Sequence, residues 1–189
     1  MERVAVLCSR NRHKARELEA LLPGWRIEIL DADDYPPETG ETFATNARIK
    51  ARFGVRRTGL PTLADDSGIE VDALDGRPGV LSARYAPEGP PAIAKLLVEL
   101  EGVAERRARY VSELVALAPD GAELRGTGVL EGSVAAEARG EGGFGYDPIF
   151  VPDGEERTVG ELGDEWKAAN SHRARAAAAL CAELARAAS

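Results

Sequence analysis

The stretch "GLPTLADDSGIEVDAL", residues 59–74, contains a short apolar run that ends in two adjacent carboxylates, Asp65 and Asp66. The run predicts a buried strand, and Ser67 and Gly68 predict a sharp turn directly after the acids. Functional groups of open α/β sheets gather at the carboxyl ends of strands. The two acids are therefore the first candidates for a functional site, although an acidic strand-to-turn junction would have the same sequence.

Strands and helices alternate on both sides of this stretch. Apolar runs predict strands at residues 3–9 and 25–30, and helical spacing of apolar residues predicts helices at 11–22 and 42–57. Beyond it we expect a Gly/Pro-rich connection at 76–91 and an amphipathic helix at 92–103. Three strands should follow at 107–119, 123–140 and 148–152, and a final helix at 171–188. This order predicts an α/β fold with a mixed sheet.

The 189 residues, 44% of them hydrophobic, suffice for one substantial core, so we expect a single domain over residues 1–189. The net charge of -8 disfavours binding to a nucleic-acid backbone. The N-terminal apolar run is too short for a signal peptide or a membrane span. Cys8 and Cys181 suit two buried thiols in a reducing compartment. We therefore expect a cytoplasmic protein without nucleic-acid or membrane partners.

The segment "SRNRHK", residues 9–14, lies at the first expected strand-to-helix junction. Ser9 and Asn11 can cap the helix, and Lys14 lies in its first turn, where free amides and the positive end of the helix dipole favour an anion. Cationic side chains in a first turn oppose that dipole unless an anion arrives. The segment therefore favours a polyphosphate over a solvated helix start, although it lacks the glycines of a Walker A loop.

Two later segments combine aromatic, acidic and basic side chains. In "EGGFGYDPIF", residues 141–150, glycines allow close approach, Phe144 can stack on a base, and Asp147 can accept hydrogen bonds from a base or ribose. An aromatic-rich turn before a strand is the structural alternative. The segment "WKAANSHR", residues 166–173, places basic groups at a helix start, which solvent exposure explains equally well.

Six segments together resemble one known family. They are "SRNRHK", "ETGETFATNARIKA", "LADDSG", "PGVLSARY", "GGFGYDPIF" and "KAANSHRARA". They recur in the order and spacing of the Ham1-like inosine triphosphate pyrophosphatases, from Val4 to the final helix. The resemblance implies a two-lobed α/β fold with a long, bent mixed β-sheet flanked by helices, a nucleotide in the inter-lobe cleft, and usually a homodimer.

The resemblance also implies an activity. Members of this family use magnesium to hydrolyse the non-canonical purine nucleotides ITP, dITP and XTP to the monophosphate and pyrophosphate, which removes deaminated purines from the nucleotide pool. Asp66 is implied as the catalytic carboxylate and a metal ligand, with Asp65 beside it and Glu38 as another ligand. Glu41 is the alternative to Glu38.

The same segments imply the substrate-binding residues. Those for the phosphates are Ser9, Asn11, Lys14, Lys50 and Ser67. Those for the base are Phe144, Gly145, Tyr146, Asp147, Lys167, His172 and Arg173. An arginine only donates hydrogen bonds, so it suits the 6-oxo acceptor of hypoxanthine or xanthine and opposes the 6-amino group of adenine.

Two other functions are open on the sequence: a modified-pyrimidine nucleotide pyrophosphatase, and a purine-nucleotide sensor without turnover. The "GGFGYDPIF" and "SHR" segments argue against the first, and the acidic set argues against the second. The chain also departs from the family pattern at Arg10, where glycine is usual, and in the segment "APEGPPAIAKLL", residues 86–97, which lacks the asparagine familiar before "KLL". We expect the phosphate loop and one lobe edge to differ accordingly.

Overall fold

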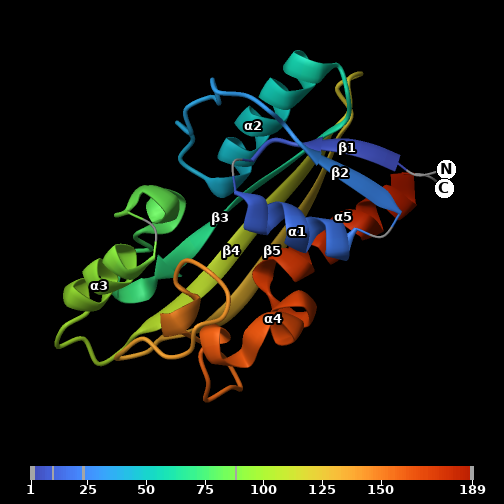
Figure 1. Ribbon diagram of the computed structural model, residues 1–189. Helices are drawn as coiled ribbons and strands as arrows, with labels where there is room; N and C mark the ends of the chain where they lie inside the picture. Colours follow the sequence, from blue (N-terminus) through green and yellow to red (C-terminus); the bar gives the residue numbers. More distant parts are fainter. Residues whose placement is uncertain (1–2, 10, 23, 88, 188–189) are drawn as a thin grey trace. The chain divides into compact units, whose positions relative to one another are not determined.

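A computed structural model describes residues 3–9, 11–22, 24–87 and 89–187 (Figure 1). The strands are β1 (Arg3–Leu7), β2 (Trp25–Ile29), β3 (Thr62–Val71), β4 (Arg107–Leu117), β5 (Glu123–Val134) and β6 (Phe150–Pro152). The α-helices are α1 (Arg12–Leu21), α2 (Phe43–Thr58), α3 (Pro90–Glu99), α4 (Val159–Asn170) and α5 (His172–Ala187). The 3-10 helices are η1 (Asp72–Leu74), η2 (Gly79–Arg84) and η3 (Asp147–Ile149).

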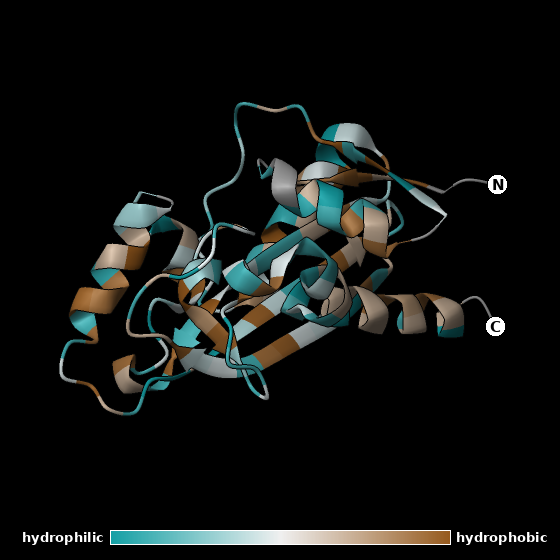
Figure 2. Ribbon diagram, turned by 60° about the horizontal axis from the view of Figure 1, so that its bottom comes forward, coloured by the Kyte–Doolittle hydropathy of each residue, from teal (hydrophilic) through white to brown (hydrophobic). Residues whose placement is uncertain are grey.

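The strands form a six-stranded mixed sheet in the order β2-β1-β3-β4-β5-β6. β1 is parallel to β2 and to β3, whereas β5 is antiparallel to β6. Hydrophobic residues recur along the strands, and the helices carry both hydrophobic and hydrophilic residues (Figure 2). The predicted α/β fold with a mixed sheet is confirmed.

One helix is absent from the sequence prediction. α4 begins after Thr158, whose side chain accepts a hydrogen bond from Glu161 N while Glu161 bonds back to Thr158 N. This capping box starts the helix, but Gly163 interrupts it with a φ of 82°. The interruption breaks the apolar periodicity that would have revealed a helix before residue 170.

The strand that carries the two acids is longer than predicted. β3 continues through Ser67 and Gly68 to Val71, so the predicted turn after Asp66 is wrong. Gly68 instead permits a close approach, because a Cβ there would overlap Ser82 Oγ and the Gly79 carbonyl oxygen. The glycine is therefore needed for packing beside the strand, and not for reversing the chain.

The contacts within the chain divide it into two compact units. Unit 1 contains residues 1–66, 112–128 and 172–189, and unit 2 contains residues 67–111 and 129–171. β3, β4 and β5 each contribute residues to both units. The assignment of residues 1–189 to one domain stays a prediction.

In unit 1, alternate strand residues pack against different helices. One core cluster joins strand residues to α1 and α5, and includes Leu7, Leu18, Leu63, Leu114 and Leu180. Another joins the neighbouring strand residues to α2, and includes Cys8, Ala47, Ala64, Ala51 and Val115. Because side chains alternate along a strand, Asp65 shares the face of Leu63 and Asp66 shares the face of Ala64. The two acids therefore meet different helices.

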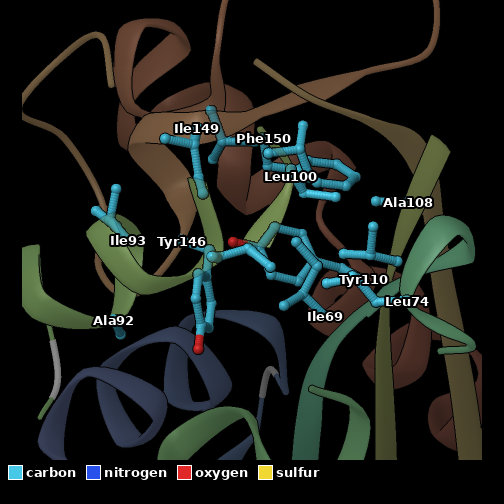
Figure 3. Close-up of a cluster of buried hydrophobic side chains, with 14 of the residues drawn as sticks. Ile69, Leu74, Ala92, Ile93, Leu100, Ala108, Tyr110, Tyr146, Ile149 and Phe150 are labelled. Atoms are coloured by element: carbon cyan, nitrogen blue, oxygen red, sulfur yellow. The ribbon is translucent and has the colours of Figure 1, made fainter. Parts of the chain in front are cut away.

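Unit 2 has a core of its own, built from β3, α3, β4 and the segment around β6. Figure 3 shows Tyr110, Tyr146 and Phe150 among the aliphatic side chains of this core. The ring centroids of Tyr110 and Phe150 lie 4.4 Å apart. This packing fixes Phe150, which follows the loop that carries Phe144 and Asp147.

Two further sequence predictions can be compared with the described residues. Among the described residues, no helix is long and apolar enough to cross a membrane. Cys8 is buried, as predicted, whereas Cys181 is only half-buried, and both are free thiols. Burial raises the pKa of the Cys8 thiol to about 11, so it stays protonated near neutral pH.

Candidate active site

The residues before α1 form a cap that directs Lys14. Ser9 Oγ accepts a hydrogen bond from Asn11 N at 3.1 Å, and Asn11 Oδ1 accepts one from Lys14 N at 3.4 Å. Lys14 Nζ lies 2.6 Å from Asp65 Oδ2. The predicted capping by Asn11 is thus confirmed, with Ser9 supporting the turn before it. Arg10 lies outside the described residues.

Arg173 reaches Asp65 from the first turn of α5. That turn lies directly against β5, because a Cβ at Gly128 would overlap the His172 carbonyl oxygen. Arg173 Nη2 lies 3.4 Å from Asp65 Oδ2, and Nη1 donates a hydrogen bond to Glu17 of α1. With its side chain only 1% exposed, this guanidinium is held between two carboxylates, as a buried charge requires.

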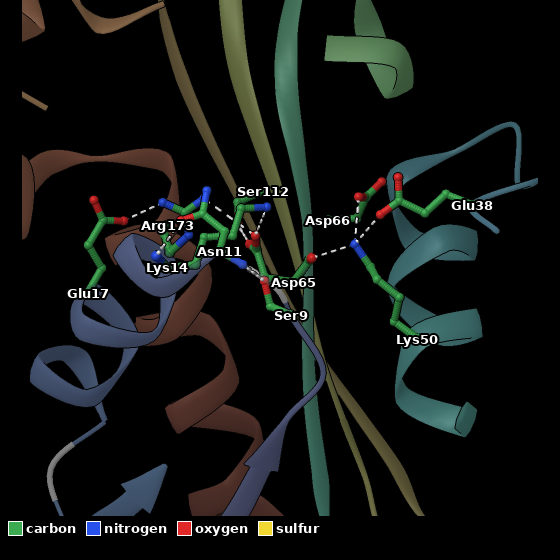
Figure 4. Close-up of polar contacts among 10 residues, drawn as sticks. All are labelled: Ser9, Asn11, Lys14, Glu17, Glu38, Lys50, Asp65, Asp66, Ser112 and Arg173. Atoms are coloured by element: carbon green, nitrogen blue, oxygen red, sulfur yellow. Dashed lines mark hydrogen bonds and ion pairs between the residues drawn. The ribbon is translucent and has the colours of Figure 1, made fainter. Parts of the chain in front are cut away.

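Asp65 is the centre of this buried network (Figure 4). Ser112 Oγ donates a hydrogen bond to Asp65 Oδ1 at 2.6 Å, while Lys14 and Arg173 lie at Oδ2. Burial alone would raise the pKa of Asp65, but the charges of Arg173 and Lys14 hold that pKa well below its usual value. Asp65 is therefore ionised and orients the cations around it.

Asp66 lies on the other face of β3 and meets one cation (Figure 4). Lys50 Nζ is 2.8 Å from Asp66 Oδ1, 2.8 Å from Glu38 Oε1, and donates to the Asp65 carbonyl oxygen at 2.8 Å. Asp66 Oδ2 is buried and has no hydrogen-bond partner among the described residues. Burial raises the pKa of Asp66, and the charge of Lys50 offsets only part of that rise. Asp66 is thus a poorer acid than an ordinary aspartate, with one unused oxygen.

Glu38 reaches Lys50 from the loop before α2. Gly40 N donates to Asn46 Oδ1 at 2.7 Å, and Thr42 caps α2 by accepting from Thr45 N at 3.1 Å. These bonds hold the loop against the helix that carries Lys50. Glu41 is exposed, so the structure favours Glu38 over Glu41 as the acid beside Asp66.

The three predicted metal ligands do not gather. The described residues contain no group of three or more His, Cys, Asp or Glu side chains that could hold a metal ion. Asp65 is engaged by Lys14, Arg173 and Ser112, and its role as a metal ligand stays a prediction. Magnesium needs only one or two carboxylates when phosphates and waters complete its shell. Asp66 with its unused Oδ2, and Glu38 beside it, fit that donor set.

A second polar cluster is buried in unit 2. Asp147 Oδ2 accepts hydrogen bonds from Phe144 N and Lys167 Nζ, both at 2.8 Å, and Asp147 Oδ1 accepts from Tyr110 OH at 3.2 Å. Lys167 Nζ also lies 3.8 Å from the centroid of the Phe144 ring, in a cation–π contact. Asp147 therefore fixes both the aromatic ring and the lysine that the sequence associates with a base.

Tyr146 is held separately within the same unit. Its hydroxyl donates to the Ser82 carbonyl oxygen at 3.0 Å, and burial raises its pKa to about 12. Gly145 beside it has a φ of 64°, which favours glycine. The loop that carries Phe144, Gly145, Tyr146 and Asp147 is thus anchored at its acid and at its tyrosine.

Comparisons with known proteins agree with these arrangements. The model of the Ham1 family matches residues 5–183. The chain belongs to the Ham1 family. Among Ham1-family relatives, it is 47% identical over 182 residues to the dITP/XTP pyrophosphatase of Deinococcus deserti, covering 94% of this chain and 88% of the relative. It is 51% identical over 180 residues to the dITP/XTP pyrophosphatase of Symbiobacterium thermophilum, covering 92% and 90%. The solved structure of the Staphylococcus aureus Ham1 protein has a TM-score of 0.87 and 36% identity, over 98% of this chain and 100% of that one.

Within this Ham1-family chain, the predicted base-binding residues fall into two groups. Phe144, Gly145, Tyr146, Asp147 and Lys167 belong to unit 2. His172 and Arg173 belong to unit 1, where both are buried. Arg173 forms ion pairs with Glu17 and Asp65, and its predicted role as a base ligand stays a prediction. Ser67 is half-buried in β3, and its phosphate role stays a prediction.

Three residues of these clusters were missed by sequence reasoning: Glu17, Ser112 and Tyr110. Glu17 lies three residues after Lys14 on an expected helix, so helical spacing could have placed it on the same face. Ser112 and Tyr110 lie two residues apart on an expected strand, and their alternation could have placed them on one face. No sequence signal links either of them to Asp65 or Asp147, because those contacts depend on strand pairing.

Proposed function

We propose that this Ham1-family chain hydrolyses the non-canonical purine nucleoside triphosphates ITP, dITP and XTP to the nucleoside monophosphate and pyrophosphate, and so removes deaminated purines from the nucleotide pool. One observation carries the proposal: Asp66 is a buried carboxylate of raised pKa whose Oδ2 has no partner among the described residues. The names and coverage of the two pyrophosphatase relatives support these substrates.

The charges around β3 support a need for a divalent cation. The ion pairs around Asp65 and Asp66 join the cations Lys14, Lys50 and Arg173 to four carboxylates, those of Glu17, Glu38, Asp65 and Asp66. This set is negative by one charge when all its members are ionised, so by itself it repels a polyphosphate. We propose that Asp66 and Glu38 hold magnesium, which would neutralise phosphate oxygens and assist the departure of pyrophosphate.

The residues of unit 1 divide the remaining work. Asp66 accepts a proton from the water that attacks the α-phosphorus, and its raised pKa brings it nearer to the pH at which a general base works well. Lys14 and Lys50 attract the phosphates as compact point charges. Ser9 and Asn11 present the start of α1, where backbone amides favour an anion. Fixed charges of this kind provide the positioning on which phosphoryl chemistry depends.

The residues of unit 2 are assigned to the base. Phe144 offers a ring for stacking, and Asp147 holds Lys167 against that ring. The ammonium of Lys167 only donates hydrogen bonds, so it suits the 6-oxo group of hypoxanthine or xanthine. A 6-amino group in the same place would leave two donors facing each other, which costs about 1 to 3 kcal/mol.

We also propose a homodimer, on the basis of the resemblance to the family. Light scattering coupled to gel filtration measures the molar mass directly. A mass of one chain, about 20.1 kDa, at every concentration tested contradicts this part of the proposal.

Pyrophosphate release from ITP, XTP, ATP, GTP and dUTP, with magnesium and with excess chelator, tests the activity. We expect magnesium-dependent release that strongly favours ITP and XTP over ATP, and equal amounts of nucleoside monophosphate. Release only from dUTP would transfer the function to pyrimidine nucleotides. Tight binding of ITP without release from any nucleotide would leave a nucleotide sensor, and either result overturns the proposal.

A further inference from the structure

Glu17 has no role in the steps above, although its contacts place it within the Asp65 network. Lys14 and Glu17 lie three residues apart on one face of α1. Lys14 bonds to Asp65, Glu17 bonds to Arg173, and Arg173 also lies beside Asp65. The four side chains thus form a row of alternating charge, Glu17, Arg173, Asp65 and Lys14 (Figure 4).

The row is electrically neutral only because Glu17 is present. Asp65 alone would have to balance both Lys14 and Arg173, whose side chains are 14% and 1% exposed. The side chain of Glu17 is 24% exposed, so it is the member of the row most accessible to solvent. Its carboxylate binds one side of the Arg173 guanidinium and leaves the other side to Asp65.

Loss of this charge would affect the cations in two ways. The row would carry one net positive charge, which attracts anions more strongly. Arg173 would also lose one of its two described carboxylate partners and would compete more strongly with Lys14 for Asp65 Oδ2. The first effect strengthens anion binding, whereas the second weakens the ion pair that holds Lys14 on Asp65.

We propose that Glu17 is a positioning residue that balances Arg173 and keeps Lys14 on Asp65, so that the site binds polyphosphate without retaining the pyrophosphate product. The inference rests on the proposed function, because it assumes that Lys14 meets phosphate. Glu17 itself touches neither the substrate nor the attacking water in this assignment. It acts through Arg173 and Asp65, and its effect is therefore opposite in sign on binding and on turnover.

Glu17→Gln tests the proposal, with Glu19→Gln as the matched control, since Glu19 is an exposed carboxylate on the same helix. Calorimetry with pyrophosphate and magnesium measures product affinity without any turnover. We expect Glu17→Gln to bind pyrophosphate about three- to tenfold more tightly than the parent at low salt, and the difference to shrink at high salt. We expect kcat for ITP to fall about tenfold, and Glu19→Gln to change neither value more than about twofold.

Glu17→Asp separates charge from reach. It keeps the negative charge, so pyrophosphate affinity should stay within about twofold of the parent while kcat falls, because the shorter side chain holds Arg173 less well. Unchanged or weaker pyrophosphate binding by folded Glu17→Gln overturns the inference, since a purely structural role predicts no gain in affinity. If the parent hydrolyses no ITP yet Glu17→Gln still binds pyrophosphate more tightly, the proposed function fails and the charge balance stands.

Discussion

Asp65 and Asp66 are neighbours in the chain, but β3 directs them to opposite faces and into opposite environments. Asp65 meets Lys14 of α1, Arg173 of α5 and a hydroxyl, and its pKa falls well below the usual value. Among the described residues, Lys50 of α2 is the only cation within ion-pair distance of Asp66, and the pKa of Asp66 rises. Both side chains are almost fully buried, so burial does not distinguish them. The difference lies in the number of cationic partners.

This difference separates structure from chemistry. A carboxylate whose charge is strongly stabilised is a weak base and a good organiser of cations. A carboxylate whose ionised form is destabilised has a raised pKa and is a better proton acceptor near neutral pH. The two faces of one strand thus provide an anchor and a base at adjacent positions.

The largest expected effect is on stability at Asp65. Asp65→Asn removes the counter-charge of two buried cations, and breaking a buried pair in this way costs about 3 to 5 kcal/mol of unfolding free energy. Urea unfolding at pH 7 measures the loss, and Asp31→Asn, at an exposed position, is the control that should stay within about 0.5 kcal/mol. A loss below about 1 kcal/mol for Asp65→Asn would contradict the structural role assigned to Asp65.

The stability loss caused by Asp65→Asn should depend on pH. The folded-state pKa of Asp65 is depressed, so its stabilisation is complete above the unfolded pKa of about 3.9 and is lost as the pH falls through the folded value. The stability difference between the parent and Asp65→Asn should therefore be constant near neutrality and should shrink in acid. A difference that grows in acid contradicts the assigned direction of the pKa.

The next effect is on catalysis at Asp66. Asp66→Asn should lower kcat for ITP by at least about a hundredfold, as expected for the loss of a general base. Unlike Asp65→Asn, it should leave stability equal or slightly higher, because a raised carboxylate pKa means that the charge opposes folding. Matched kinetics and urea unfolding of both variants provide the test. Full turnover by Asp66→Asn, or a stability loss as large as that of Asp65→Asn, would contradict the assignment of a catalytic role to Asp66 and a structural role to Asp65.

The smallest effect at neutral pH should come from Lys50→Met. The charge of Lys50 lowers the pKa of Asp66, so its removal lets that pKa rise further, and the acid limb of the rate profile should move to higher pH. At pH 8 we expect only about a tenfold loss of kcat/KM, because a positive charge that attracts the phosphates is lost. Lys95→Met is the control, since Lys95 contacts Tyr85 in unit 2. An acid limb that moves to lower pH would reverse the assigned influence of Lys50.

Some of these contacts could be predicted from local patterns alone. The spacing of apolar residues located α1 and α2 to within a residue or two, and the cap by Asn11 followed from its side chain and its position before a helix. The predicted turn at Gly68 was wrong, because the same residue type serves a turn or a close approach. Only the neighbouring Gly79 and Ser82, brought beside β3, distinguish the two uses.

The sequence by itself determined the mixed α/β fold, the family and the candidate acids, because strand and helix periodicity and ordered motifs are properties of neighbouring residues. Side-chain alternation along a strand could also have placed Asp65 and Asp66 on opposite faces. Only the tertiary structure decided which cations each acid meets, because Lys14, Lys50 and Arg173 come from three helices far apart in the chain. The pKa of a buried carboxylate depends on those distances, and no local pattern contains them.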